Sequence, residues 1–377
     1  MKRRDRVINL TQNLIRINSE NPLGSERDIA EYICKFLKRF GYKPRIVEFV
    51  PGRSNVTCLI KSRNSLKRIL ISPHLDTVPA GPGWKVPPFS GKILKRKIYG
   101  RGASDCKGNL AVTLAVLASL RKQRIVFDNL DIIFAATADE ETGSLVGFKP
   151  LLKRIKPLDY ALVLDGSNFE ITYAQKGLLH LRIIIYGKKA HGAYPERGVN
   201  AIDKAAKALI KINEWAVSVN RLYRKAELSV NAGRIEGGQK VNIVADKCII
   251  DLDFRFSLNK DTRFFTDKLR KLIKKVSKNF RLDVLNFQRP AETCPDNILI
   301  KTLKSSLRSK NINPVMQVCK GATVLNFLTE KKIPSAVFGF SSKKQAHATD
   351  EYIEIANLKK GVVLLKDFLT RLDKRIG

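Results

Sequence analysis

The chain has few acidic side chains for its size. Its 377 residues include 35 Asp and Glu against 70 Lys and Arg, which gives a formal net charge of +35. Apolar residues make up 44% of the sequence, enough for a folded core, and this excludes wholesale disorder. The basic excess favours, as a first hypothesis, an anionic partner such as nucleic acid.

Long hydrophobic runs and paired cysteines are also missing. The longest mostly apolar stretches, such as residues 111–120, are shorter than the roughly 20 residues that a membrane helix needs. The basic N-terminus has no apolar segment after it, so we expect no secretory signal and a cytoplasmic protein. The six cysteines contain no CxxC pair, which excludes a zinc ribbon or finger and favours reduced thiols.

Apolar runs alternate with stretches of helical spacing through much of the chain. Strands are predicted at 68–72, 130–137 and 160–164, and helices at 1–16, 24–40, 107–120, 296–308 and 356–374. Strands that alternate with helices indicate an α/β fold with a mainly parallel sheet.

The pattern changes between residues 179 and 290. The predicted order is strand, helix, strand, strand, helix, strand, at 179–186, 199–212, 228–235, 247–256, 262–278 and 282–287. This order is typical of a ferredoxin-like α+β unit. We therefore expect a small domain, 179–290, inserted into a larger domain formed by 1–178 and 291–377.

The candidate chemistry begins with a histidine that follows a predicted strand. His74 and Asp76 are two residues apart, so in an extended segment their side chains point the same way. A carboxylate in this position can support a metal-bound imidazole from behind. The alternative is a turn that happens to contain both residue types.

Other acids and one more histidine lie near the ends of predicted elements. Asp105 opens a helix from a glycine-rich segment, whereas Glu140, Glu141 and Asp165 follow strands, and His347 lies in a polar loop. Open α/β sheets build their sites at strand ends, although a helix cap at Asp105 and solvated loop acids are the alternatives. Two imidazoles with several carboxylates suit a dinuclear zinc site, or one for cobalt or manganese.

Short motifs along essentially the whole chain resemble a known family. They include His74-Leu-Asp-Thr-Val-Pro79, Gly100-Arg-Gly-Ala-Ser-Asp-Cys-Lys-Gly108, Asp139-Glu-Glu-Thr-Gly143, His191-Gly-Ala-Tyr-Pro195 and Ala346-His-Ala-Thr-Asp-Glu351. Each motif is weak alone, but their order and spacing are specific. Together they resemble the zinc amidohydrolases of the acetylornithine deacetylase, succinyl-diaminopimelate desuccinylase, aminoacylase and carboxypeptidase G group.

The resemblance implies roles for individual residues. One zinc ion would be held by His74, Asp105 and Asp165, and the second by a bridging Asp105, Glu141 and His347. Glu140 would be the general base, and Asp76 would orient His74. In the inserted domain, His191 would polarise the substrate carbonyl, in relatives often across a dimer interface, while Arg255 and Asn242 would hold the substrate. Without the resemblance, Arg255 is interpreted as a solvent-facing partner of Asp251 and Asp253 on an alternating strand.

The resemblance also implies the reaction. We expect a zinc-dependent hydrolase that releases an amino acid from an N-acyl amino acid, as a deacetylase or desuccinylase does, and that dimerises through the inserted domain. The alternative within the family is a di- or tripeptidase or a carboxypeptidase. An alternative of another class is a basic binding protein. Its partner would be nucleic acid or an acidic carrier protein that bears the substrate.

The distribution of charge weighs against nucleic acid as the partner. Residues 179–290 contain 24 basic and 11 acidic residues, a net charge of 24 − 11 = +13. The rest of the chain contains 70 − 24 = 46 basic and 35 − 11 = 24 acidic residues, a net charge of +22. The excess is therefore spread over both parts, and no recognised nucleic-acid motif accompanies it.

Overall fold

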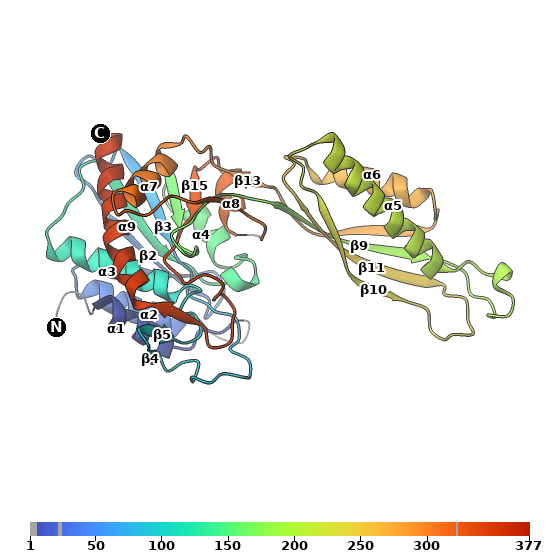
Figure 1. Cartoon of the computed structure of the whole chain (residues 1–377), viewed down its shortest axis with the longest axis horizontal. Helices are drawn as coiled ribbons and strands as arrows, with labels where there is room; N and C mark the ends of the chain where they lie inside the picture. Colours follow the sequence, from blue (N-terminus) through green and yellow to red (C-terminus); the bar gives the residue numbers. More distant parts are fainter. Residues whose placement is uncertain (1–5, 22–24, 322) are drawn as a thin grey trace. The chain divides into compact units, whose positions relative to one another are not determined.

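The structure, a computed structural model, describes residues 6–21, 25–321 and 323–377, so the first residues of the helices predicted at 1–16 and 24–40 lie outside it. The chain forms two compact units (Figure 1). Unit 1 is Met1–Ala174, Glu292–Val318 and Thr323–Gly377, and unit 2 is Gln175–Ala291 with the short segment that begins at Cys319.

A nine-stranded sheet forms the centre of unit 1. Its order is β1-β2-β6-β3-β7-β15-β8-β13, with β14 beside β8. The strands are β1 (Arg45–Glu48), β2 (Ser54–Ile60), β3 (Lys67–Ser72), β6 (Leu130–Ala136), β7 (Tyr160–Val163), β8 (Ile171–Gln175), β13 (Ala291–Glu292), β14 (Met316–Cys319) and β15 (Ser335–Val337). The central strands β6, β3, β7 and β15 are parallel, whereas β1, β2 and β8 pair antiparallel to their neighbours. Every residue of β6 is buried, which agrees with its continuous apolar run.

Seven α-helices of unit 1 lie within the described residues. They are α1 (Arg6–Arg16), α2 (Arg27–Lys38), α3 (Lys107–Lys122), α4 (Phe148–Arg154), α7 (Ile298–Arg308), α8 (Leu325–Glu330) and α9 (Ile355–Ile376). Helix α3 is buried over most of its surface, because it packs against both α1 and α9 (Figure 1). A small sheet of β4 (Ile93–Leu94), β5 (Lys97–Tyr99) and β16 (Tyr352–Glu354) joins segments far apart in the sequence.

Unit 2 has the predicted ferredoxin-like order. Its elements are β9 (Gly177–Tyr186), α5 (Ala201–Leu222), β10 (Ser229–Gly237), β11 (Lys247–Phe256), α6 (Thr262–Lys274) and β12 (Phe280–Gln288), and its antiparallel sheet has the order β10-β11-β9-β12. The fold class is thus confirmed. Helix α5 extends ten residues beyond its predicted end, because Trp215, Ala216 and Val219 continue its buried face.

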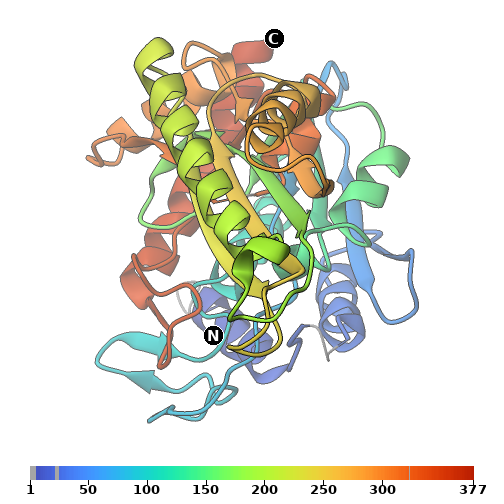
Figure 2. The same cartoon turned by 90° about the vertical axis from the view of Figure 1, so that its right-hand side faces the viewer.

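The sheet of unit 2 has one apolar face and one charged face. Residues of β11 alternate between buried and partly exposed positions. Its buried side chains, among them Phe254 and Phe256, belong to the core that α5 and α6 complete on one face of the sheet (Figures 1 and 2). The intervening positions, Asp251, Asp253 and Arg255, lie on the other face.

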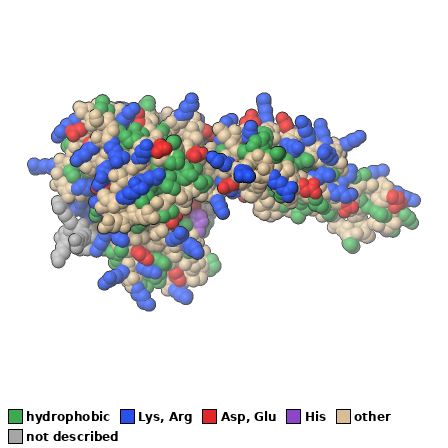
Figure 3. Space-filling view, turned by 45° about the horizontal axis from the view of Figure 1, so that its top comes forward, with side chains coloured by type: hydrophobic (Ala, Val, Ile, Leu, Met, Phe, Trp, Pro, Cys, Tyr) green, Lys and Arg blue, Asp and Glu red, His purple; other side chains and the backbone are tan. Residues whose placement is uncertain are grey.

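Basic side chains are distributed widely over the surface. Figure 3 shows Lys and Arg over the visible face of both units, with fewer Asp and Glu between them. They gather over no single element of this face, in agreement with a basic excess that both parts of the sequence share, +13 over residues 179–290 and +22 over the rest. Across the described residues, no helix combines the length and apolar character needed to span a membrane.

Candidate metal centre

The ends of three neighbouring parallel strands bring four of the predicted site residues together. His74 follows β3, Glu140 and Glu141 follow β6, and Asp165 follows β7. Strand β3 pairs in parallel with both β6 and β7, and a further bridge joins His74 to Thr137. These side chains therefore meet at one edge of the sheet, where open α/β folds place their sites.

Asp105 lies at the centre of this cluster. It comes from the glycine-rich segment before α3, and its Oδ1 is 2.9 Å from His74 Nε2. Its other oxygen, Oδ2, is 3.3 Å from Nε2 of His347, which comes from the loop before β16. Oδ1 of Asp165 lies 3.3 Å from His74 Nε2, and Oε2 of Glu141 lies 3.0 Å from His347 Nε2. The carboxylate of Asp105 thus lies between two histidine–carboxylate pairs, one formed by His74 and Asp165 and the other by His347 and Glu141.

Burial or neighbouring negative charge raises the pKa of three members of this cluster, whereas hydrogen bonds to His347 and His74 outweigh burial and lower the pKa of Asp105. Burial and the neighbouring charge of Asp105 raise the pKa of Asp165 to about 6. Burial and the charge of Asp165 raise the pKa of Glu140 well above its ordinary value. Hydrogen bonds to Asp105 and Glu141 raise the pKa of His347 to about 10. Cations placed among these groups would neutralise the same charges and displace the protons.

The residues present fit a bound cation. Oε1 of Glu141 is buried and has no hydrogen-bond partner among the described residues, and such an atom is costly unless a cation contacts it. Ligand atoms of His74, Asp105 and Glu141 all lie within 4.8 Å of one another. Imidazole and carboxylate donors of this kind suit zinc and related divalent ions.

Cys106 also lies beside the cluster, which the sequence did not predict. Its thiol lies within 4.8 Å of ligand atoms of His74 and Asp165. The backbone N–H of His74 donates to the sulfur at 3.1 Å, and burial raises the pKa of the thiol to about 12. We therefore interpret Cys106 as a buried structural thiol. In the sequence, only the position of Cys106 next to Asp105 indicates that it lies near the cluster.

Asp76 anchors the segment that follows β6 through its buried carboxylate. Its Oδ1 accepts the backbone N–H of Glu140 at 3.0 Å, and its Oδ2 accepts that of Glu141 at 3.1 Å. The side chain of Asn21 donates to Oδ2 at 2.9 Å. Nδ1 of His74 lies 2.9 Å from the backbone oxygen of Asp76 but 3.6 Å from its carboxylate. The carbonyl is therefore closer to the imidazole than the carboxylate that the sequence suggested.

Replacing Asp76 by Ala should destabilise unit 1 and reduce any activity of the site. Three buried or partly buried donors would lose their acceptor, at a cost of about 3 kcal/mol or more of the free energy of unfolding. Urea denaturation checks this value against the control Asp296→Ala, because the Asp296 side chain is 84% exposed. Equal stability of the two variants would contradict the anchoring role.

A buried ion pair supports the same loop from a distant segment. Arg53 makes a two-pronged contact with Glu26 at 2.7–3.1 Å and reaches Asp139 at 3.5 Å. Asp139 precedes the predicted base and accepts the N–H of Val146 at 2.9 Å. Arg53 and Glu26 were not predicted from the sequence, because nothing in their local patterns distinguishes them from surface charges.

The remaining predicted site residues belong to unit 2. His191 and Asn242 are both exposed and come from adjacent segments, joined by the hydrogen bond from the Gly192 N–H to the Asn242 carbonyl at 2.8 Å. A Cβ on Gly192 would lie 3.0–3.1 Å from the backbone of Asn242, so a larger residue here would require the two segments to move apart slightly. Arg255 donates to Asp253 at 2.9 Å and 3.1 Å, which is the strand-face contact that its alternating position suggests.

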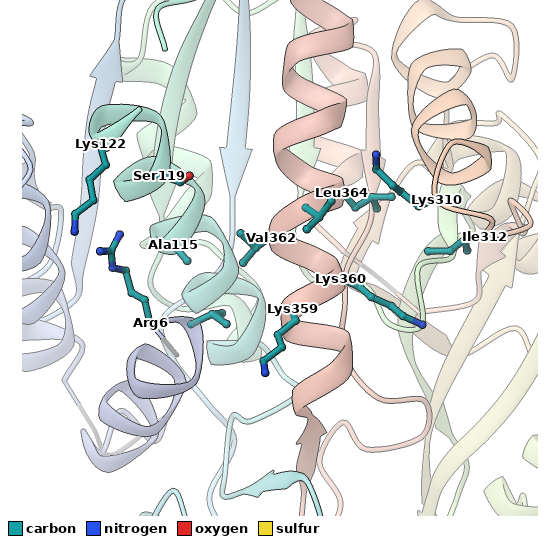
Figure 4. A pocket seen from close by; sticks show the side chains of 12 residues that line it. Arg6, Ala115, Ser119, Lys122, Lys310, Ile312, Lys359, Lys360, Val362 and Leu364 are labelled. Atoms are coloured by element: carbon teal, nitrogen blue, oxygen red, sulfur yellow. The ribbon is translucent and has the colours of Figure 1, made fainter. Parts of the chain in front are cut away.

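A separate cavity of about 540 Å³ lies in unit 1 on the surface of α1, α3 and α9 (Figure 4). Its lining is apolar with a basic rim, and it consists of Arg6, Val7, Ala115, Ser119, Lys122, Lys310, Ile312, Lys359, Lys360, Val362, Val363 and Leu364. None of these residues is an acid, a histidine or a cysteine. We therefore assign this cavity no part in the chemistry.

The chain and its fold have counterparts among known proteins. The chain is 26% identical, over 96% of its own length and 96% of the relative's, to a probable succinyl-diaminopimelate desuccinylase of Staphylococcus aureus. A tripeptidase structure from Staphylococcus aureus matches with a TM-score of 0.80 and 22% identity, covering 98% of this chain and 99% of the other.

A third relative is described as a dinuclear metal binding peptidase. This Bacillus subtilis structure matches with a TM-score of 0.76 and 14% identity over 99% of both chains. At these identities the two solved structures show that the fold is shared. The model of Peptidase family M20/M25/M40 matches residues 70–371, which include every predicted site residue. The chain therefore belongs to peptidase family M20/M25/M40, a family of hydrolases.

Proposed function

We propose that this protein is a zinc-dependent amidohydrolase that hydrolyses the amide bond of an N-acyl amino acid, as a deacetylase or desuccinylase does. The observation that carries the proposal is the cluster in which Asp105 contacts both His74 and His347, with Glu140 at the same edge of the sheet. The likeness to a probable desuccinylase supports this choice of substrate class.

Five side chains would hold two metal ions. His74, Asp105 and Asp165 would bind one, and Asp105, Glu141 and His347 would bind the other. Three carboxylates supply three negative charges against the four positive charges of two divalent ions. When bound, such ions lower the pKa of water from about 15.7 toward about 7 and polarise the substrate carbonyl. Cobalt or manganese could replace zinc with the same donors.

The proton transfers would then fall to Glu140. In our proposal its carboxylate accepts a proton from the attacking water and later passes it to the leaving amine. Asp76 supports this role, because it fixes the backbone of Glu140 at the edge of the sheet. His191 would donate a hydrogen bond to the carbonyl oxygen as it gains negative charge, while Arg255 and Asn242 would hold the substrate.

We further propose that unit 2, predicted at 179–290 as an inserted lid and dimerisation domain, joins two copies of the chain. Strand β10 is an edge strand and is exposed at eight of its nine residues. Beside it, α5 exposes the apolar side chains Ile202, Ile210 and Val217, each at least 40% accessible. An unpaired edge next to an apolar stripe favours pairing with a second copy.

A peptidase is the second candidate. The fold is shared with a tripeptidase of similar length, and the same cluster could hydrolyse a peptide bond as well as an acyl amide. The two candidates differ in what lies on the carbonyl side of the scissile bond: a simple acyl group or an amino acid. Only the substrate, and not the chemistry of the cluster, separates them.

A substrate panel tests both candidates. The purified protein, supplied with zinc or cobalt, should release amino acid from N-acetyl or N-succinyl amino acids faster than from di- and tripeptides. A chelator should abolish this activity and added zinc should restore it, because the proposed ligands otherwise hold only protons. Faster release from peptides would favour the peptidase. No hydrolysis anywhere, together with tight salt-sensitive nucleic-acid binding, would contradict both.

A further inference from the structure

A buried carboxylate outside the predicted ligand set contacts the segment that carries Asp105. Glu351 has no exposed surface. Its Oε1 accepts the backbone N–H groups of Ser104 at 2.7 Å and Asp105 at 3.0 Å. Its Oε2 accepts that of Gly102 at 3.0 Å, and its backbone oxygen accepts that of Gly100 at 2.8 Å. One residue thus receives four N–H groups from a six-residue segment.

Arg101 extends this contact to two other segments of the site. Its Nη1 donates to Oε2 of Glu351 at 2.9 Å, and also to the backbone oxygen of Ala348 at 3.2 Å. Its Nη2 donates to the backbone oxygens of Pro79 and Ala80 at 3.3 Å. Arg101 is itself only 3% exposed. Its guanidinium therefore links the segments that follow His74 and His347 to the segment of Asp105.

The position of Glu351 in the sequence strengthens this link. It lies four residues after His347, in a segment where His347 has a backbone φ of +61°. Such a conformation persists only where the surroundings hold it. The segment that carries Asp105 also contains Gly102 at φ +82°, where a Cβ would come within 3 Å of Thr77 and Lys107. The carboxylate of Glu351 binds the segment of Asp105 directly, and it reaches the segment of His347 through Arg101, which donates to the backbone oxygen of Ala348.

We propose that Glu351 is a positioning residue that prearranges Asp105 and His347 for their metal ions. It contacts no substrate and supplies no ligand of its own. The inference rests on the proposed function, because it assigns these two residues to metal. It differs from a purely structural role, in which Glu351 would only neutralise the buried charge of Arg101.

Isothermal titration of the metal-free protein with zinc alone tests the proposal. Glu351→Gln keeps the size of the side chain but places an amide NH₂ where an acceptor is needed. We expect its affinity for at least one zinc ion to fall about 10- to 100-fold, as for other residues that orient ligands. We also expect kcat to fall while KM changes little. Glu354→Gln is the matched control, because Glu354 is exposed and lies three residues away.

The double variant Arg101→Met with Glu351→Gln separates positioning from charge pairing. Removal of both members of a buried pair restores much of the stability that the loss of one member costs. If Glu351 positions the ligands, the double variant recovers thermal stability but not zinc affinity. Recovery of both, or zinc affinity of Glu351→Gln within about threefold of the unmodified protein, would overturn the inference. The double variant also serves if Glu351→Gln does not fold.

Hydrogen exchange gives a readout that needs no metal. In the metal-free protein, peptides that contain residues 100–105 should exchange at least tenfold faster after Glu351→Gln, because the carboxamide keeps one acceptor oxygen where the carboxylate has two, so one or two of the three amides lose their acceptor. If the unmodified protein binds no zinc, the proposed function fails. Unchanged exchange in the Glu351→Gln variant would refute the positioning role of Glu351, whether or not the protein binds zinc.

Discussion

Replacing Glu140 by Gln should lower kcat by about 10²- to 10⁴-fold while the protein keeps its metal ions, because a carboxamide cannot accept the proton of the attacking water. The two side chains have the same shape. The anchor to Asp76 uses the backbone N–H of Glu140, so the substitution leaves it in place. The loss should therefore fall on turnover and leave the arrangement of the loop unchanged.

Two measurements on the same preparation decide this prediction. Steady-state kinetics on the best substrate of the panel gives kcat, and elemental analysis gives the metal content. Glu31→Gln is the control, since the Glu31 side chain is 57% exposed on α2. Retained turnover would remove Glu140 as the base. Loss of metal in the variant would instead indicate that Glu140 is a ligand.

Replacing Asp105 by Asn should remove most of the bound metal and lower activity by about 10³-fold or more. The ions supply several kcal/mol of transition-state stabilisation, and each 1.4 kcal/mol corresponds to about a tenfold change in rate. Within the described part of the chain, Asp105 is the one carboxylate that contacts both His74 and His347, so loss of its charge affects both metal positions.

The comparison with His347→Ala makes this prediction specific. His347 contacts Glu141 and Asp105 but not Asp165, so its loss should release one ion and leave the other with His74. Metal content measured after dialysis should therefore be near one ion for His347→Ala and lower for Asp105→Asn. Asp128→Asn is a suitable control, because the Asp128 side chain is 54% exposed. Two ions retained by Asp105→Asn would exclude a shared ligand.

Much of the fold follows from local patterns in the chain. The alternation of buried strands with helices indicated the parallel sheet, and β6 and β7 lie within a residue of their predicted ends. The period of two in β11 indicated a sheet covered on one face. The short strands β4, β5 and β16 were not predicted, because β4 has only two residues and β5 pairs with β16 across more than 250 residues of sequence, so neither shows apolar periodicity.

The helices of unit 2 also combine features that the local sequence predicts with features that depend on tertiary contacts. Asn200 and Asp261 cap α5 and α6 with side-chain hydrogen bonds, and such caps can be recognised locally. The C-terminal end of α5 could not be recognised locally, because its last turns are held by the buried contacts of Trp215 and Val219 in the core of unit 2. For α5 and α6, local signals thus located the start of the helix better than its end.

The sequence by itself determined which residue types are available for chemistry. Because the chain has only four histidines and twice as many basic as acidic residues, the acids at strand ends were the clearest candidates for a site. The motifs around them indicated the family that the chain belongs to. Only the tertiary structure decided how they meet. Parallel strands bring His74, Glu141 and Asp165 to one edge, and the buried Glu351 holds Asp105 among them. Such convergence depends on strand order and on contacts between distant segments, which no local pattern encodes.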